Sequence, residues 1–337
     1  MDEFALINKI TTSSYRRQEL VKGVGDDAAV FRLPHADTVI AVDTFVEGIH
    51  FSKETVVPWQ IGYRLLAVNL SDIAAMGANP LFYLVSLVLP DECEDSFVVE
   101  VFAGMKKLAD EYGIDLIGGD TVSGSELTLS LTIVGSVPKG RARYRSDARR
   151  DDVVFVTGTL GDARAGLQLL LDGQAVAVDD PFRSALIKRH QEPSPRLAFA
   201  QKLRTLERLA LNDVSDGIAN ELNEISFSSG VAIEIDDALL PISEGLQLFS
   251  EEEQWEFKYF GGEDFELVGT VPADQFAAVQ AAGEASGVPV TKIGVVVDDD
   301  KEKQGVYVWH DGAKKALEKH GYVHRSRDKN DEDNDDK

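Results

Sequence analysis

The chain has 337 residues, of which 44% are hydrophobic and 27% are charged. This length is typical of two globular domains, and the composition provides enough apolar residues for their cores. The formal net charge of −24 argues against non-specific nucleic-acid binding, because phosphate and carboxylate repel each other. An anionic substrate is compatible with this charge only where cations neutralise the site. The sequence has no run of about 18 apolar residues, so we expect neither membrane insertion nor export.

The sequence contains no persuasive nucleophile. The single cysteine, Cys93, cannot form an intramolecular disulfide, which predicts a reducing compartment and hence the cytoplasm. Its acidic neighbours in segment 91–94 disfavour a reactive thiolate. The histidines lack the paired spacing of a zinc site, and neither a Walker loop nor a protein-kinase motif set occurs. Residues 325–337 contain no apolar side chain and are predicted to form a disordered acidic tail.

The first 140 residues are predicted to alternate strands with helices. The β-branched run 38–43 predicts a buried strand that ends at Asp43. Pro58 is predicted to begin a helix that ends at Gly77, and a second helix is predicted over 96–112. Further strands are predicted at 81–89, 126–137 and 114–117, the last of them running into Gly118, Gly119 and Asp120.

Segment 138–152 is rich in charge and poor in apolar residues, so it is the predicted domain boundary. It separates an N-terminal domain, 1–140, from a C-terminal domain, 150–324. In the second domain, strands are predicted at 153–157, 265–271, 291–297 and 305–309. Helices are predicted at 162–171, 181–190, 195–206, 216–225 and 274–286. The predicted fold class is therefore mixed α/β (α+β) in both halves.

Several acids are predicted to lie beside glycine, directly after a strand, or inside an apolar helix. A turn or a helix cap explains any one of them more simply than a function does. Together they predict a site for several Mg²⁺ ions, because buried carboxylates are costly unless paired or metal-bound. Asp213 is predicted to end a strand and Asp216 to open a helix, so that Ser215 could face a phosphate. The segments are 25–27, 43–44, 118–121 and 213–217, with Asp72 as a fifth acid.

In order along the chain, these segments resemble the thiamine-monophosphate kinase family. The matching stretches are the opening 2–7, GVGDDAAVF at 23–31, VDTFVEGIHF at 42–51, AVNLSDIAAMGANP at 67–80, LIGGDT at 116–121, RHQEPSPR at 189–196, NDVSDGI at 212–218 and GGEDFEL at 261–267. As an ordered set they are specific, although each alone means little. The family is similar to aminoimidazole ribonucleotide synthetase and selenophosphate synthetase. The resemblance implies an N-terminal α/β domain that dimerises and a C-terminal α/β domain.

The resemblance implies that the chain uses ATP and Mg²⁺ to convert thiamine phosphate into thiamine diphosphate. It implies metal contacts at Asp27, Val42, Asp43, Asp72, Asp120, Asp213 and Asp216. It implies ATP contacts at Gly119, Asp120, Arg145 and Ser215, and thiamine phosphate contacts at His50, Glu263 and Tyr322. Among these, Asp120, Arg145 and Asp213 are the implied catalytic residues. Ala41 and Val42 stand where the family often has Ser and Thr, so a metal contact there would use backbone oxygen.

The acceptor oxygen of thiamine phosphate is already ionised, so the reaction needs no general base. The obstacle is to bring two anions together, and Mg²⁺ with Arg145 would neutralise them and favour direct in-line transfer. Two alternatives stay open, another ATP-using synthetase of the superfamily and a non-catalytic nucleotide-binding regulator. Simpler roles also stay open for single residues. His50 could be a core histidine, Glu263 a helix-start acid and Arg145 a surface linker residue.

A homodimer is expected from the resemblance, and the sequence offers a physical reason. The strand 126–137 places Leu127, Leu129, Leu131 and Ile133 on one face. Such strands leave more apolar surface than one small core covers, which favours a symmetric contact between sheets. The alternative is that the second domain covers this face within one chain.

Overall fold

The computed structural model describes residues 15–22, 30–31, 36–173, 180–297 and 304–319. Two of the implied site residues, Asp27 and Tyr322, lie outside the described residues. So do the predicted acidic tail and the matching stretch 2–7. A short strand pair, β1 (Leu20–Lys22) and β2 (Val30–Phe31), precedes the main sheets.

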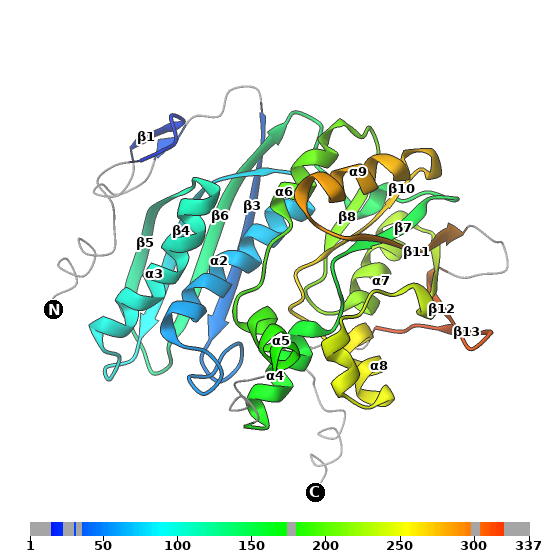
Figure 1. Ribbon diagram of the computed structural model, residues 1–337. Coiled ribbons are helices and arrows are strands. Elements are labelled where there is room, and N and C mark those ends of the chain that lie inside the picture. The colour runs from blue at the N-terminus through cyan, green and yellow to red at the C-terminus, as the bar shows by residue number, and fades with distance from the viewer. Residues whose placement is uncertain (1–14, 23–29, 32–35, 174–179, 298–303, 320–337) are drawn as a thin grey trace, which may run out of the picture.

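The first main sheet has four strands in the order β3-β6-β4-β5. Its strands are β3 (Ala36–Val46), β4 (Asn79–Leu89), β5 (Asp115–Ser123) and β6 (Thr128–Pro138). The pairs β3·β6 and β6·β4 are antiparallel, and β4·β5 is parallel. Helices α2 (Pro58–Ala75) and α3 (Asp95–Tyr112) cover one face of this sheet (Figure 1).

The alternation of side chains along β6 explains which face the helices cover. Leu129, Leu131 and Ile133 are fully buried, whereas the residues between them are small, polar and partly exposed. The leucine face is therefore covered by helices of its own half of the chain, and our reason for expecting it to form a dimer contact was wrong. The open face instead carries Ile40 and Val42 of β3, which are 65% and 59% exposed.

The second main sheet has seven strands in the order β13-β12-β9-β11-β7-β10-β8. They are β7 (Val153–Thr157), β8 (Ala210–Asp213), β9 (Ala232–Asp236), β10 (Leu267–Val271), β11 (Val290–Val297), β12 (Gly305–His310) and β13 (Ala313–Ala316). The helices of this half are α4 (Asp162–Leu171), α5 (Pro181–Gln191), α6 (Leu197–Lys202), α7 (Ile218–Ser229), α8 (Glu251–Phe260) and α9 (Phe276–Ser286). Short 3-10 turns occur at Arg145–Asp147, Leu203–Thr205, Asp237–Leu239, Glu244–Leu248 and Ala273–Gln275.

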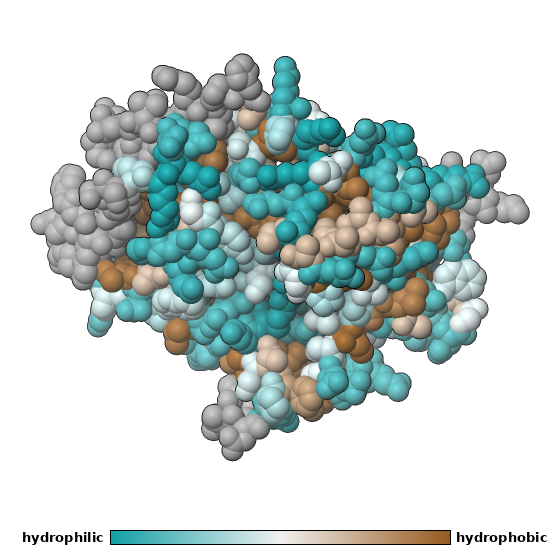
Figure 2. All heavy atoms as spheres, turned by 45° about the horizontal axis from the view of Figure 1, so that its top comes forward, coloured by the Kyte–Doolittle hydropathy of each residue, from teal (hydrophilic) through white to brown (hydrophobic). Residues whose placement is uncertain are grey.

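The two sheets share a hydrophobic cluster. It extends from Leu65 of α2 and Leu131 of β6 to Phe155 of β7 and Phe199 of α6. Outside this core, the face of the molecule seen in Figure 2 is mostly hydrophilic. None of the helices in the described part of the chain is long and apolar enough to span a membrane.

The mixed α/β class is confirmed, and the differences in detail have physical causes. The strand expected to end at Asp43 continues to Val46, because its pairing with β6 continues. The segment 118–120, expected to follow a strand, lies inside β5, where it pairs with β4. Helix α7 begins at Ile218 rather than at Asp216, after Gly217 in a positive-φ conformation. Strands β1, β2, β9 and β13 and helix α8 were not predicted.

Candidate functional site

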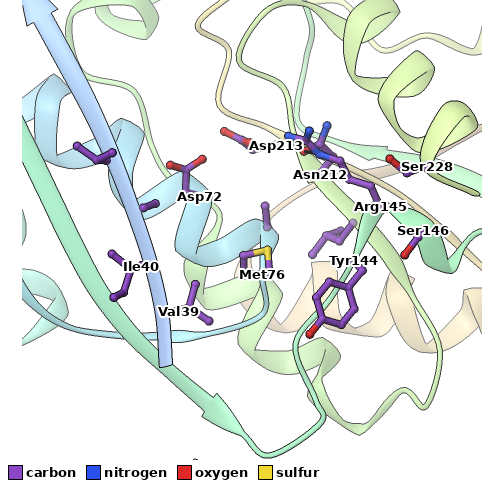
Figure 3. A pocket seen from close by; sticks show the side chains of 14 residues that line it. Val39, Ile40, Asp72, Met76, Tyr144, Arg145, Ser146, Asn212, Asp213 and Ser228 are labelled. Carbon is purple, nitrogen blue, oxygen red and sulfur yellow. Dashed lines mark hydrogen bonds between the residues drawn. The ribbon is translucent and has the colours of Figure 1, made fainter. Parts of the chain in front are cut away.

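Four acids converge where the two sheets meet. Asp43 comes from β3, Asp72 from the end of α2, and Asp213 from the last position of β8. The carboxyl groups of Asp43 and Asp72 are close enough to share a hydrogen bond, and Ser71 Oγ donates to Asp213 Oδ2 at 2.8 Å. Asp216 lies close enough to raise the pKa of Asp43. Figure 3 shows the side chains of Asp72 and Asp213 next to each other, although they come from different halves of the chain.

Burial and mutual repulsion make these carboxyl groups difficult to ionise together. Burial raises the pKa of Asp72 to about 9, and the nearby Asp213 and Asp43 add to this rise. Burial also raises the pKa of Asp213 to about 6, and it raises the pKa of Asp43. A proton or a cation between the oxygens relieves this repulsion. The donors are hard carboxylate oxygens, the kind that Mg²⁺ prefers.

A cavity of about 510 Å³ adjoins the acids. Its lining includes Val39 and Ile40 of β3, Met76 after α2, and the aromatic ring of Tyr144. Asp72, Asp213, Arg145 and Asn212 line its polar end, which is uppermost in Figure 3. A cavity that is apolar at one end and charged at the other suits a ligand with an aromatic base and a charged chain, such as a nucleotide.

A hydrogen-bond network fixes Arg145 at this polar end. Arg145 Nε donates to Asn212 Oδ1 at 2.9 Å, and Asn212 Nδ2 donates to Glu221 Oε2. The other carboxylate oxygen of Glu221 accepts from Ser215 Oγ and from the backbone N–H of Asp216, both at 3.2 Å. The network therefore joins Arg145 and Ser215, both implied to contact ATP, through the buried Glu221.

A second polar group surrounds Glu263. Its Oε1 accepts a hydrogen bond from Arg64 Nη2 at 2.5 Å, and its Oε2 lies 3.2 Å from His190 Nδ1. His50 is close enough to influence Glu263, and its ring stacks on Phe45 with centroids 5.8 Å apart. Burial alone would raise the pKa of Glu263, but Arg64, His190 and His50 outweigh it and lower this pKa to about 2. The structure therefore brings His50 and Glu263 together.

Within one chain, residues 119–120 lie apart from the acid cluster. They are in β5, and three strand spacings of about 4.8 Å separate β5 from β3. Across the sheet Asp120 is in register with Ser86, and Ser86 with Ser130, on the face turned away from α2. Asp43 is opposite the buried Leu131 and therefore points to the helix side.

The acids do not form a complete metal site in one chain as described. Among the described residues, no three or more His, Cys, Asp or Glu side chains are arranged to hold a metal ion. Asp27 lies outside those residues, and Asp120 is on the other face of the sheet. Val42, implied as a backbone ligand, lines the cavity.

From the sequence alone, no role was predicted for Arg64, His190, Asn212 or Glu221. The sequence does contain a signal for Arg64. Like Asp72, it is a charged residue in the apolar helix α2. His190 and Asn212 lie within matching stretches, 189–196 and 212–218. Nothing local in the sequence indicates that Glu221 connects to Arg145.

Comparisons with known proteins agree with this architecture. Residues 25–137 match the family described as AIR synthase related protein, N-terminal domain, and residues 149–306 match its C-terminal domain. The chain is 43% identical over 327 residues to the thiamine-monophosphate kinase of Bacillus subtilis, covering 96% of this chain and 99% of the relative. It is 40% identical over 330 residues to that of Escherichia coli K12, covering 96% of this chain and 98% of the relative.

Solved structures give the same result. The thiamine-monophosphate kinase of Stenotrophomonas maltophilia superposes with a TM-score of 0.83 at 38% identity, covering 93% of this chain and 97% of that one. AaThiL complexed with AMPPCP and TMP superposes with a TM-score of 0.76 at 33% identity, covering 96% and 97%. Since both domains match and near full-length relatives exceed 30% identity, the chain belongs to the thiamine-monophosphate kinase family.

Proposed function

We propose that this enzyme transfers the terminal phosphoryl group of ATP to thiamine phosphate, giving thiamine diphosphate and ADP. The observation that carries the proposal is the convergence of Asp43, Asp72 and Asp213 beside a cavity whose polar end also holds Arg145. This arrangement suits a reaction between two phosphates. The relatives named thiamine-monophosphate kinase, and AaThiL complexed with AMPPCP and TMP, support ATP and thiamine phosphate as the substrates.

The acid cluster is the proposed site of Mg²⁺. Its donors are carboxylate oxygens, and the raised pKa of Asp72 marks a position where added positive charge is favourable. Bound Mg²⁺ would neutralise the phosphates of donor and acceptor. The proposed ligands are Asp27, Asp43, Asp72, Asp120, Asp213, Asp216 and the backbone oxygen of Val42.

The protein's own groups orient the nucleotide. Arg145, whose Nε donates to Asn212 and whose Nη1 lies 3.5 Å from Glu224, would turn its guanidinium to the phosphates, and Ser215 offers a hydroxyl close by. The apolar lining around Tyr144 receives the base. The acceptor phosphate is already ionised, so no residue has to remove a proton, and transfer is direct and in line. His50, Glu263 and Tyr322 contact the acceptor.

The active form is a homodimer that pairs the open faces of two N-terminal sheets. Ile40 and Val42 are exposed on this face and would be buried in the contact. The edge strands of the sheet are β3 and β5. When two such sheets face each other about a two-fold axis, their edge strands also meet. Strand β5 of one copy then lies beside strand β3 of the other. Such an arrangement would bring β5 of the partner subunit, the strand that carries Asp120, beside the strand that carries Asp43.

The function is tested with the purified full-length chain, Mg²⁺ and ATP. Thiamine phosphate should give equal amounts of ADP and thiamine diphosphate, and free thiamine should give neither. Chromatography of the thiamine compounds identifies the product, and a coupled assay measures ADP. Phosphorylation of free thiamine without any of its monophosphate, or ADP formation that ignores the acceptor, would contradict the proposal.

A further inference from the structure

Arg64 is an unusual residue for the middle of a helix that packs in the core. It is fully buried in α2, where an unpaired charge is strongly destabilising. Its one ion pair among the described residues is with Glu263, at 2.5 Å. Its Nε and Nη1 have no hydrogen-bond partner within that same part of the chain. The position of Arg64 is therefore explained only in part by the folded protein's own contacts.

His190 lies next to the other oxygen of the Glu263 carboxylate. It lies in the last turn of α5, is 3% exposed, and places Nδ1 3.2 Å from Glu263 Oε2. Burial and the nearby Arg64 lower the pKa of His190. Each oxygen of Glu263 thus has one neighbour from a separate element, and the Glu263 side chain still keeps 31% exposure. The carboxylate is fixed on one side and open on the other.

The backbone also holds Glu263 in place. Its φ is 71°, an uncommon conformation for a residue other than glycine, and its N–H donates to Ser215 O at 2.7 Å. A side chain on Gly262 would place Cβ 2.6 Å from Ser215 O, so only glycine fits there. The irregular segment that carries Glu263 is therefore held against the segment that carries Ser215.

Glu266 lies three residues further on and provides a contrast. It is fully buried, and its oxygens accept from Arg189 Nη2 at 2.7 Å, Arg196 Nε at 2.6 Å and Thr157 Oγ1 at 2.7 Å. Donors from the protein thus satisfy the hydrogen-bonding capacity of this buried carboxylate, as is typical of a structural ion pair. Glu263, bonded to Arg64, close to His190 and still partly exposed, has the pattern of a binding group.

We infer that Arg64 and His190 are positioning residues that aim the Glu263 carboxylate at the ring end of the acceptor, where it accepts a hydrogen bond from the ring amino group. This inference rests on the proposed function. Arg64 and Asp72 lie eight residues apart on α2, which is two turns and about 12 Å along the helix axis. An acceptor whose phosphate lies at the acid cluster therefore reaches Glu263 with its ring system. Helix α2 therefore sets the distance between the acid cluster, which binds the phosphate, and Glu263, which binds the ring.

The test is Arg64→Lys, which keeps the charge but replaces the rigid guanidinium, whose Nη2 donates to Glu263 Oε1, by a flexible ammonium. We expect the KM for thiamine phosphate to rise about tenfold, with kcat and the KM for ATP within about twofold of the parent. His190→Gln provides a second variant with the same expected direction. Arg196→Lys is the matched control, because it changes an arginine that holds the neighbouring Glu266. It should lower the melting temperature without a selective change in the KM for thiamine phosphate.

Two further measurements separate positioning from a general loss of structure. In the double variant Arg64→Lys/Glu263→Gln, the increases in KM should combine to less than their product, because both act through one carboxylate. Oxythiamine phosphate, which carries oxygen in place of the ring amino group, should be a poor acceptor for the parent. Arg64→Lys should reduce that discrimination. Fully multiplicative effects, or unchanged KM and discrimination in both single variants, would overturn the inference. A parent enzyme that does not phosphorylate thiamine phosphate would instead refute the proposed function.

Discussion

Asp72 occupies a position where a carboxylate is unfavourable until a proton or a cation neutralises it. Its pKa of about 9, raised by burial, Asp213 and Asp43, exceeds the usual 3.8. Between these values the folded chain holds a proton that the unfolded chain has lost, so this group lowers stability as pH rises. Asp72→Asn cannot ionise and should remove that dependence. We therefore expect the metal-free variant to melt at a higher temperature than the parent at pH 8.5, with less difference at pH 5.

The same substitution should reduce phosphoryl transfer at least a hundredfold at saturating Mg²⁺, because it removes a proposed ligand. Glu100→Gln, which removes an exposed acid from α3, is the control for a change of net charge. It should alter neither turnover nor the pH dependence of melting. Near-normal turnover in Asp72→Asn would show that Asp72 is not a principal ligand.

The residues of the site could be predicted only where a short stretch of sequence marks them. Asp43 and Asp213 each come at the end of an apolar run of sequence, and Asp72 interrupts an apolar helix, so each is visible in a short window. The pair of Arg64 with Glu263 joins residues far apart in the chain, and no window contains both. For Asp120 the local signal predicted the wrong structure, because two glycines before an acid resemble the end of a strand. The strand continues instead, with Gly119 packed so closely that a Cβ would lie 2.0 Å from Val85 O.

At the scale of elements, helices α2 and α3 pack together through glycine. A Cβ on Gly104 would lie 1.8 Å from the carbonyl oxygen of Trp59, and one on Gly62 equally close to that of Val101. Gly104→Ala must therefore push the helices apart. We expect it to lower the free energy of unfolding by about 3 kcal/mol, measured by denaturant titration.

Ala103→Ser, one position away on the exposed side of α3, is the control for this substitution. It should change the free energy of unfolding by about 0.5 kcal/mol or less. An equal effect of the two substitutions would show that the helices do not approach each other at Gly104.

Most elements were predictable because periodicity and terminal residues are encoded locally. Pro58 begins α2, and Gly113 ends α3 with a φ of 63°. The order of the strands was not predictable. Strand β10 lies between β7 and β8, and β9 pairs in parallel with β12, which follows it by about 70 residues. Such pairings depend on the packing of the whole sheet rather than on any one segment.

For the whole molecule, the dimer proposal makes a prediction about mixed subunits. Asp120→Asn and Asp213→Asn should each be nearly inactive as pure proteins. If each site takes Asp120 from the partner subunit, a heterodimer of the two variants has one site with both acids intact. Subunits mixed after mild dissociation should then regain about a quarter of the parent activity. Light scattering should give twice the chain mass of 36.8 kDa for every sample.

Each outcome of the mixing experiment bears on a separate part of the proposal. Dimers without regained activity would place both acids in the same subunit's site. A scattering mass equal to one chain would refute the dimer itself. An affinity tag on one variant should retain the untagged other variant after mixing, which shows that the subunits exchange.

The hydrophobic cluster that joins Leu131 of the first sheet to Phe155 and Phe199 of the second has a consequence for cooperativity. Neither half can unfold without exposing apolar surface of the other, and the hydrogen bond from Ser71 to Asp213 would break at the same time. The two domains should therefore melt as one thermodynamic unit. Calorimetry of the metal-free protein should show a single transition whose calorimetric and van't Hoff enthalpies agree per cooperative unit. Two separated transitions would mean that each sheet forms its own stable core.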